Sequence, residues 1–507
     1  MTALDAVPEM GAAPAGHPDA AGSPTTVGAP PCDGADAAAA PTTIGAPPCD
    51  VPDPAQGIWR RGLLAGQDPG SLAQTYGTPL YVYDLDLVAA RARTLRAWLP
   101  GRFDVAYAVK ANPSLSVIAA AVAAGTGVDV SSPGELAAAT RAGVPPGRTV
   151  LTGPGKSDAL LARAVEAGVR AVVVESPHEL DRLERAAAQA RRHARVLIRL
   201  AAHEDQSFGM AWEDALAAAR HCVRSRWLEP LGVHAFGVST ERDAAVLAVH
   251  IRRTVEAGRR LALEAGFALR VVDAGGGLGI PYADDDIPLD TTRLGTLLAR
   301  LDEALASDPL TRGVRVVLEP GRFLVGPAGA YLARVVDVKR LPGRRVAVLD
   351  GGINHLLAPA LVGRRHRLRL IPAARTDGSE PAFAAPEADS IGTAGGSADP
   401  PGRSSVPPDA PAAAPAVRPR VPVDVVGPLC TWLDVLDRVD AFPEPRPGDL
   451  VVALDTGAYG YTQSMPWFLS HVAPAEVAIS HGRAVLVRPR REAEAWLEGQ
   501  RLPSFED

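Results

Sequence analysis

The feature that most constrains this fold is a regular alternation of two kinds of segment over residues 104–318. Short apolar runs rich in β-branched residues alternate with Ala-rich segments whose apolar residues recur at helical spacing. The predicted strands are 104–109, 127–130, 149–152, 171–174, 196–200, 231–235, 269–273 and 314–318. Runs that are apolar throughout are typical of parallel strands buried on both faces. The alternation therefore predicts an α/β protein with a (β/α)₈ barrel, the TIM-barrel fold.

Helices are predicted between these strands, and a different pattern follows the barrel. The predicted helices are 116–124, 133–142, 156–167, 177–192, 212–224, 244–265 and 292–306. Shorter β segments come afterwards, at 331–339, 345–349, 423–426, 450–454, 475–480 and 483–489, and 81–83 is predicted to join them. We predict a barrel domain over 86–340 and a mostly β domain, sandwich-like or barrel-like, made of 56–85 and 341–495.

Two segments lack the apolar pattern of a packed core. Residues 1–55 and 374–420 are rich in alanine, proline and glycine. Such segments cannot bury enough apolar surface to offset the entropy lost on ordering. We predict a disordered tail at 1–55 and a disordered insertion in the β domain at 374–420.

Composition argues against several classes of partner. The chain has 52 Lys and Arg against 58 Asp and Glu, a net charge of −6, and no basic block, which excludes a typical nucleic-acid or membrane-surface protein. No apolar run approaches the roughly 20 residues that span a bilayer, and the N-terminus does not resemble a secretion signal. The four cysteines show neither metal-ligand spacing nor a disulfide framework. We expect a cytoplasmic protein without a metal site.

Lys110 ends the first predicted strand and is the first candidate for chemistry. An amine in this position can form a Schiff base, and burial would lower its pKa and favour the neutral nucleophile. The simpler alternative is a lysine at the exposed end of a strand.

The last two barrel strands end in residues that complement this lysine. Chemistry in such barrels takes place at the carboxyl ends of the strands. Gly275–Gly277 follow the seventh strand, and consecutive glycines let backbone N–H groups approach a phosphate. Glu319 ends the eighth strand. A Schiff-base lysine, a phosphate cradle and an acid together indicate a pyridoxal phosphate site, with Glu319 keeping the pyridine nitrogen protonated.

Six motifs, in this order over about residues 70–490, carry a resemblance to a known family. They are Tyr-Ala-Val-Lys110-Ala-Asn-Pro, Asp129-Val-Ser-Ser-Pro-Gly-Glu135-Leu, Gly275-Gly-Gly, Glu319-Pro-Gly-Arg322, Gly427-Pro-Leu-Cys430 and Asp455-Thr-Gly-Ala-Tyr459-Gly. The chain resembles the fold-type III pyridoxal phosphate decarboxylases, which comprise the ornithine, diaminopimelate and arginine decarboxylase group and share their barrel with alanine racemase.

The resemblance implies a head-to-tail homodimer with two shared active sites. It implies that Lys110 forms the aldimine with pyridoxal 5'-phosphate, and that Cys430 of the partner subunit returns a proton to the carbanion after CO₂ leaves. The residues implied to contact the phosphate are Gly275, Gly276, Gly277, Ser239, Arg322 and Tyr459. Cys430 could instead be an apolar packing residue.

Other residues are implied to order the site. Asp129, Glu135 and His234 would lie behind the residues that touch the cofactor, although Glu135 could simply be a solvated helix start. Phe236 stands where the family has a histidine stacked on the cofactor ring, so it can stack but cannot hydrogen-bond.

Further departures concern the substrate. Thr431 replaces the acid that normally follows the cysteine and binds a distal ammonium group. Ala358 and Val362 replace an arginine and a tyrosine of the diaminopimelate enzymes, so the arginine that binds a substrate carboxylate there is missing. With Gly153-Pro-Gly-Lys156, these changes resemble a subgroup found with natural-product and exosortase-associated systems, some members of which act on an aminoacyl group held on an acyl carrier protein.

We therefore expect a lyase of amino-acid metabolism that removes the α-carboxylate of an L-amino acid, either free or held on a carrier protein. The alternative enzyme is diaminopimelate decarboxylase of lysine biosynthesis. A racemase is disfavoured because racemases of this fold pair the pyridine nitrogen with an arginine. The alternative of another class is an inactive, decarboxylase-like regulatory protein, which the retention of Lys110, Arg322, Cys430 and Tyr459 argues against.

Overall fold

The computed structural model describes residues 57–202, 207–373 and 418–503. The predicted tail at 1–55, with Cys32 and Cys49, lies outside the described residues, as does almost all of the predicted insertion at 374–420.

The predicted barrel is confirmed. Its strands are β4 (Phe103–Ala108), β5 (Gly127–Val130), β6 (Thr149–Leu151), β7 (Ala171–Val174), β8 (Ala194–Arg199), β9 (Leu228–His234), β10 (Val271–Asp273) and β11 (Arg315–Leu318). Neighbouring strands pair in parallel, and β11 pairs with β4 to close the ring. Small and β-branched side chains, among them Ala106, Val150 and Val317, form a buried cluster of their own. The barrel therefore has a packed interior, and only its rim is open to a ligand.

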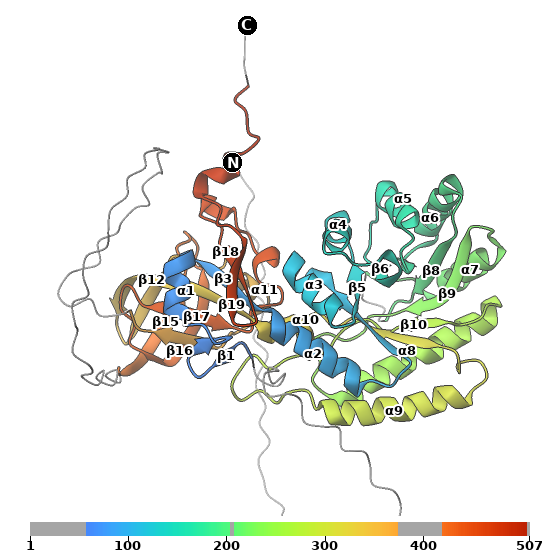
Figure 1. The fold of residues 1–507 in the computed structure, drawn as a ribbon, viewed down its shortest axis with the longest axis horizontal. Helices are drawn as coiled ribbons and strands as arrows, with labels where there is room; N and C mark the ends of the chain where they lie inside the picture. The colour runs from blue at the N-terminus through green and yellow to red at the C-terminus, as the bar shows by residue number, and fades with distance from the viewer. Residues whose placement is uncertain (1–56, 203–206, 374–417, 504–507) are drawn as a thin grey trace, which may run out of the picture. The chain divides into compact units, whose positions relative to one another are not determined.

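Helices alternate with the barrel strands (Figure 1). They are α2 (Leu85–Trp98), α3 (Leu115–Ala123), α4 (Pro133–Arg141), α5 (Asp158–Ala167), α6 (Pro177–Ala190), α7 (Trp212–Arg224), α8 (Ala244–Ala265) and α9 (Thr291–Ser307). Local sequence explains where several begin. Both α4 and α6 start at a Ser-Pro pair, in which Ser132 or Ser176 accepts a hydrogen bond from a backbone N–H of the first turn and proline occupies the first helical position.

A second, mostly β region confirms the predicted change of pattern. Its strands are β3 (Leu80–Asp84), β12 (Gly329–Leu341), β13 (Arg344–Leu349), β14 (Leu368–Ile371), β15 (Arg420–Val426), β16 (Val435–Pro443), β17 (Leu450–Leu454), β18 (Ala475–Ser480) and β19 (Arg483–Arg488). The central order is β16-β15-β13-β12-β3-β18-β19, and β17 pairs with both β12 and β14. The early strand β3 thus joins this sheet, as predicted. The domain limits themselves stay predictions.

Several elements escaped the sequence analysis. They are the strands β14 and β16, a small hairpin of β1 (Trp59–Arg60) and β2 (Leu63–Leu64), and the helices α1 (Pro69–Tyr76), α2, α10 (Arg322–Val325) and α11 (Ala358–Val362). Most of these elements are too short to give a strong periodic signal. Strand β16 is longer, but it is an edge strand with mixed polar and apolar residues, so its periodic signal is also weak.

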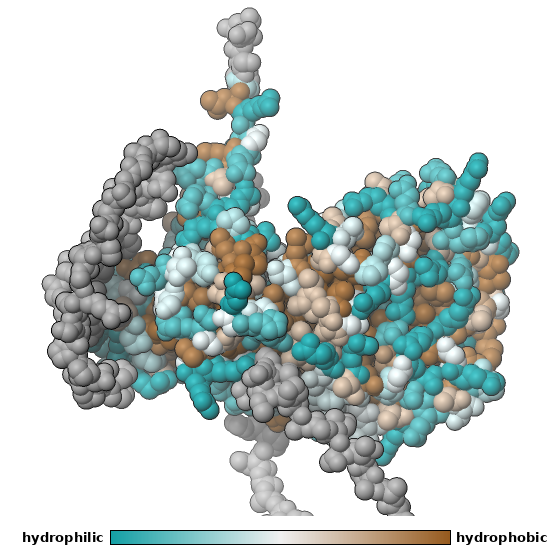
Figure 2. Space-filling model, viewed as in Figure 1, coloured by the Kyte–Doolittle hydropathy of each residue, from teal (hydrophilic) through white to brown (hydrophobic). Residues whose placement is uncertain are grey.

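On the face shown in Figure 2, hydrophilic side chains lie over the outer helices of the barrel. Within the described part of the chain, no helix has the length and hydrophobicity needed to cross a bilayer.

Candidate active site

Lys110 lies at the carboxyl end of β4, in a short 3₁₀ turn (Val109–Ala111). Its Nζ is 3.1 Å from Oδ2 of Asp129, which follows on the neighbouring strand β5. Thr152, just after β6, donates a hydrogen bond to the other carboxylate oxygen of Asp129. The Asp129 side chain is fully buried, whereas that of Lys110 is 43% exposed. Asp129 therefore holds the amine of a lysine whose side chain is partly exposed.

The expected lowering of the Lys110 pKa was wrong. The Asp129 carboxylate raises the pKa of Lys110 above its ordinary value, and Glu319 and Tyr459 add to this, so their charges outweigh the opposing effect of burial. Burial in turn raises the pKa of Asp129, and the nearby Glu319 raises it further. The ammonium group of Lys110 is stabilised by this acid until it loses a proton to react.

Three buried side chains meet at the ends of β9, β10 and β11. They are His234, Asp273 and Glu319. Nε2 of His234 is 3.4 Å from Oε2 of Glu319. Burial and the negative charge of Glu319 raise the pKa of Asp273 well above its ordinary value. For Glu319 burial acts in the same direction, but His234 and Lys110 together hold its pKa below the ordinary value. Burial and charge therefore shift the pKa of Asp273 upward and that of Glu319 downward, so Glu319 is the stronger acid of the pair.

This cluster could hold an ion or a hydrogen-bonding group. Its ligand atoms lie within 4.8 Å of one another, which is close enough for a metal ion. However, His234 already pairs with Glu319, and the raised pKa of Asp273 weakens it as a ligand, because a metal binds the deprotonated carboxylate. Oε1 of Glu319 is buried and has no hydrogen-bond partner among the described residues. The cluster is therefore better suited to accept a proton-bearing group from a ligand.

The glycine turn after β10 packs tightly against its neighbours. Gly275 and Gly277 have φ of 66° and 112°, which favours glycine. A Cβ on Gly276 would lie 2.5 Å from the carbonyl oxygen of Glu319. Phe236 is half-buried, and its side chain lies next to the Cβ position of Gly275. Packing alone therefore requires these glycines. The turn also brings its backbone close to Phe236, the candidate ring-stacking residue. Ser239, three residues further along the chain, is exposed.

A loop from the β region completes the rim beside Lys110. The backbone N–H of Tyr459 donates to the carbonyl oxygen of Ala111 at 2.8 Å, and Asn112 donates from Nδ2 to the carbonyl oxygen of Gly457 at 3.0 Å. The guanidinium carbon of Arg322, at the start of α10, lies 4.7 Å from the centre of the Tyr459 ring. The structure thus brings Arg322 and Tyr459 together next to the lysine turn.

Glu135 orders the backbone after Asp129. Its Oε2 accepts the N–H of Ser131 at 2.7 Å, and its own N–H donates to Oγ of Ser132. This reciprocal pairing is a form of capping box at the start of α4. Glu135 is half-buried at the start of α4, and its carboxylate orders the backbone next to Asp129.

Cys430 is exposed and lies in a loop organised by a single carboxylate. Asp434 accepts backbone N–H groups of Leu429 and Ile353 at 2.7 and 2.8 Å. The structure does not bring Cys430 into contact with Lys110, and its exposure excludes the alternative of a buried packing residue within this chain. The next residue but one, Trp432, is 83% exposed.

Sequence reasoning missed four residues of this rim: Thr152, Asp273, Tyr282 and Arg364. Asp273 could have been found, because it ends a predicted strand directly before the glycine turn. Tyr282 and Arg364 lie in connecting segments without a periodic pattern, and only the fold brings them near Arg322.

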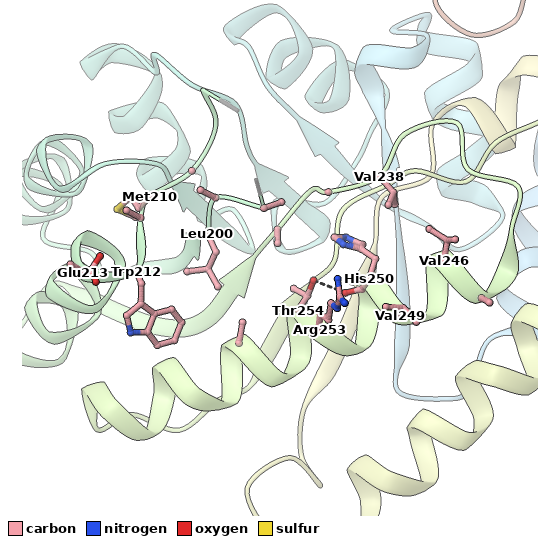
Figure 3. A pocket seen from close by; sticks show the side chains of 18 residues that line it. Leu200, Met210, Trp212, Glu213, Val238, Val246, Val249, His250, Arg253 and Thr254 are labelled. Carbon is pink, nitrogen blue, oxygen red and sulfur yellow. Dashed lines mark hydrogen bonds between the residues drawn. The ribbon is translucent and has the colours of Figure 1, made fainter. Parts of the chain in front are cut away.

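A cavity of about 1140 Å³ lies beside this rim, between α8 and the ends of β8 and β9 (Figure 3). Its described lining includes Ala235, Gly237 and Val238, which flank Phe236, but not Lys110. The cavity therefore adjoins the candidate ring-stacking segment without forming the lysine site.

The buried side chain of His366 predicts that the free energy of unfolding depends on pH. Burial lowers the pKa of His366 to about 4, and Arg364 and Arg322 contribute. The imidazole is then neutral in the folded protein but titrates near 6.5 in the unfolded chain, so stability is lost as pH falls below 6.5 towards 4. Replacing His366 by asparagine, which can still donate to the carbonyl oxygen of Leu454, should flatten the pH dependence by about 1.4 kcal/mol per pH unit in this window. Urea unfolding of both proteins at pH 7, 6 and 5 measures this; parallel curves would contradict it.

Comparisons with known proteins agree with this geometry. A family model for the pyridoxal binding domain of pyridoxal-dependent decarboxylases matches residues 85–326. A diaminopimelate decarboxylase of Neisseria meningitidis is 32% identical over 83% of this chain and 95% of that protein. An L-glutamyl-[BtrI acyl-carrier protein] decarboxylase of Niallia circulans is 28% identical over 84% of this chain and 94% of that protein. The crystal structure of a diaminopimelate decarboxylase from M. jannaschii with L-lysine has a TM-score of 0.73 at 24% identity, over 87% of this chain and 96% of that one.

The residues of the rim fit a pyridoxal phosphate group. Lys110 offers an amine on a partly exposed side chain, and the unpartnered Oε1 of Glu319 would accept a hydrogen bond from a protonated pyridine nitrogen. Phe236 offers an aromatic face, and the glycine turn with Arg322 offers donors for a phosphate.

Proposed function

Because the chain belongs to the pyridoxal-dependent decarboxylases, we propose that it removes CO₂ from the α-carbon of an amino acid at the Lys110 rim. The protein is a pyridoxal phosphate-dependent carboxy-lyase, as its relatives are. The observation that carries the proposal is the convergence of Lys110, held by Asp129, with the buried Glu319 cluster on one end of one barrel.

The cofactor, when bound, supplies an electron sink for the carbanion that CO₂ leaves behind. The chain's own residues bind the cofactor and orient it. Lys110 supplies the amine that anchors the cofactor, and Asp129 keeps that amine in place. Glu319 would hold a proton at the pyridine nitrogen of the cofactor, and the contact with His234 and the charge of Lys110 keep the pKa of Glu319 below its ordinary value. Phe236 stacks, and the glycine turn, Ser239, Arg322 and Tyr459 are assigned to the phosphate.

The names of the relatives favour meso-diaminopimelate as the substrate over an unspecified L-amino acid. Diaminopimelate decarboxylases from Neisseria meningitidis and from Methanothermobacter thermautotrophicus match nearly their whole length, at 32% and 30% identity. We therefore place diaminopimelate first among the substrates to be tested.

A second candidate is an aminoacyl group on a carrier protein, which would place the chain in the natural-product subgroup. The Niallia circulans relative, whose name specifies such a substrate, is nearly as similar. Thr431 favours this candidate, because a hydroxyl cannot pair with the distal ammonium of diaminopimelate as an acid would.

CO₂ release from the purified, pyridoxal phosphate-loaded protein tests the substrate. Rapid turnover of meso-diaminopimelate would establish the first candidate. Turnover only of an L-glutamyl carrier protein, followed by mass analysis, would establish the second. A protein that shows neither an absorption band of bound cofactor nor any turnover would contradict the proposed function and favour a regulatory role.

We also propose a homodimer in which Cys430 acts in the partner's site. Cys430 is exposed and is flanked by segments with many exposed apolar side chains, a surface that a second copy would cover. They are Leu361, Val362, Trp432, Leu433, Met465, Trp467, Phe468 and Leu469. Hydrogen bonds join these segments, from the N–H of Leu357 to Ser464 and from the N–H of Ile353 to Asp434.

Replacing Cys430 by alanine should lower kcat by about 10²-fold without weakening cofactor binding, since it removes a proton donor and no cofactor ligand. If the site is shared, mixing this variant with Lys110→Ala should restore about a quarter of wild-type activity, because half of the dimers are mixed and each has one intact site. No recovery after subunit exchange, shown by a tagged copy, would contradict the shared site.

A further inference from the structure

Two segments that follow β9 and β10 run side by side at the rim. We call them the Phe236 segment, residues 235–241, and the glycine segment, residues 273–279. Backbone N–H groups of the first donate to carbonyl oxygens of the second near both ends, from Ala235 to Asp273 at 2.9 Å and from Glu241 to Gly277 at 2.8 Å. The two segments therefore form one unit, and their spacing depends on what joins them between these two points.

His250 of α8 contacts both segments in that interval (Figure 3). Its Nε2 lies 3.0 Å from the carbonyl oxygen of Ala274, the residue before the glycine turn. Because a carbonyl oxygen can only accept, Nε2 carries the proton and donates it. A Cβ on Gly237 would lie 3.0 Å from Nδ1 and 3.1 Å from Cε1 of the same ring. One imidazole thus binds the residue that precedes the glycine turn and packs against the residue that follows Phe236.

The Phe236 segment faces the cavity of about 1140 Å³ on the side of α8. Ala235, Gly237 and Val238 line this cavity from the segment, and Val249 and His250 line it from the helix. A backbone that borders a cavity has fewer packed atoms behind it than a strand in a close-packed core. A single polar contact across this region therefore contributes more to holding the segment than it would in the core.

The glycine segment is held from its other side by β11. The N–H of Ala274 donates to the carbonyl oxygen of Val317 at 3.0 Å, and the carbonyl oxygen of Gly275 accepts the N–H of Glu319 at 2.8 Å. The Cβ position of Gly275 is 3.1 Å from Cδ2 of Phe236. Because the turn touches the Phe236 side chain, a shift of the turn also moves that ring.

We propose that His250 is a positioning residue, whose hydrogen bond to Ala274 keeps the glycine turn and the Phe236 ring at the spacing that binds the cofactor. This inference rests on the proposed function, which assigns the glycine turn to the phosphate of pyridoxal phosphate and Phe236 to its ring. The phenyl ring has no polar atom that could fix its own position, so the neighbouring backbone must do so. His250 acts through the two segments and not through a contact of its own with the cofactor.

Two variants of equal length separate the hydrogen bond from packing. His250→Gln can still donate from its side-chain amide to the carbonyl oxygen of Ala274, whereas His250→Met has a similar shape but no donor. Absorption titration of protein freed of cofactor measures the dissociation constant of pyridoxal phosphate. We expect His250→Met to raise this constant roughly 5–10-fold, as for the loss of one hydrogen bond, and His250→Gln to stay within about twofold of wild type. Val249→Ala enlarges the same cavity from the same helix and should leave the constant unchanged.

Amide hydrogen exchange of residues 273–279, followed by mass spectrometry in the protein without cofactor, gives an independent readout. Exchange should be faster in His250→Met than in wild type or His250→Gln. Equal losses of affinity in the methionine and glutamine variants, or an equal loss in Val249→Ala, would overturn the inference, because packing would then hold the turn. Unchanged exchange in His250→Met would also overturn it. A wild-type protein that binds no pyridoxal phosphate would contradict the proposed function, and the exchange result would still decide whether His250 orders the turn.

Discussion

Replacing Lys110 by alanine should lower kcat by at least about 10³-fold, the largest effect that we expect on activity, since the residue supplies the covalent attachment of the cofactor. The band of bound cofactor near the visible edge should also shift or disappear, and borohydride should no longer fix the cofactor to the protein. Absorption spectra and CO₂ release, recorded side by side for variant and wild type, measure both effects.

A charge-preserving variant separates chemistry from stability. Lys110→Arg keeps a cation beside Asp129, so its stability should stay near that of wild type, yet a guanidinium cannot attach the cofactor. It should be as inactive as the alanine variant. Full activity of either variant would show that Lys110 takes no part in the reaction. It would favour the alternative that Lys110 is simply a lysine at the exposed end of a strand.

Replacing Lys156 by methionine should cost about 3–5 kcal/mol of unfolding free energy, the largest effect on stability. The Lys156 side chain is completely buried, and its Nζ donates to Glu179 at 3.0 Å and to the carbonyl oxygen of Gly153 at 2.6 Å. Burial lowers the pKa of Lys156, but Glu179 opposes this effect. Without the lysine, the buried Glu179 carboxylate loses its ionic partner.

Urea unfolding measures this loss. An exposed pair gives the matched control: Arg252→Ala, which removes an ion pair with Glu256 on the surface of α8, should cost less than about 1 kcal/mol. Because the damage comes from an unpaired charge, the double change Lys156→Met with Glu179→Leu should recover part of the loss. Equal losses for the single and double variants would show that shape, and not charge, dominates at this position.

Local sequence was sufficient for most of the barrel. Strands such as Gly127–Val130 and helices such as Ala244–Ala265 are confirmed at their predicted ends, because a fully buried strand and an amphipathic helix each have their own hydrophobic period. Edge strands such as β16 were missed, since their exposure depends on neighbours that are distant in sequence.

Parts of the candidate site followed in the same way. Lys110, Gly275–Gly277 and Glu319 each end a strand, and parallel strands of a barrel end on one rim, so their proximity could be deduced from position alone. The protonation states could not. Lys110 was expected to have a lowered pKa, but Asp129 reverses the sign, because an opposite charge at 3.1 Å outweighs desolvation.

The amino-acid sequence by itself thus determined the barrel, the second β region and the residues that end its strands, because these depend on periodicities of a few residues. Only the tertiary structure decided which of those residues share a charge, which buried oxygen of Glu319 is without a partner, and that His250 of α8 donates to the carbonyl oxygen of Ala274. The physical reason is that electrostatic energy depends on distances in space and on burial, and neither is fixed until segments far apart in the chain have packed together.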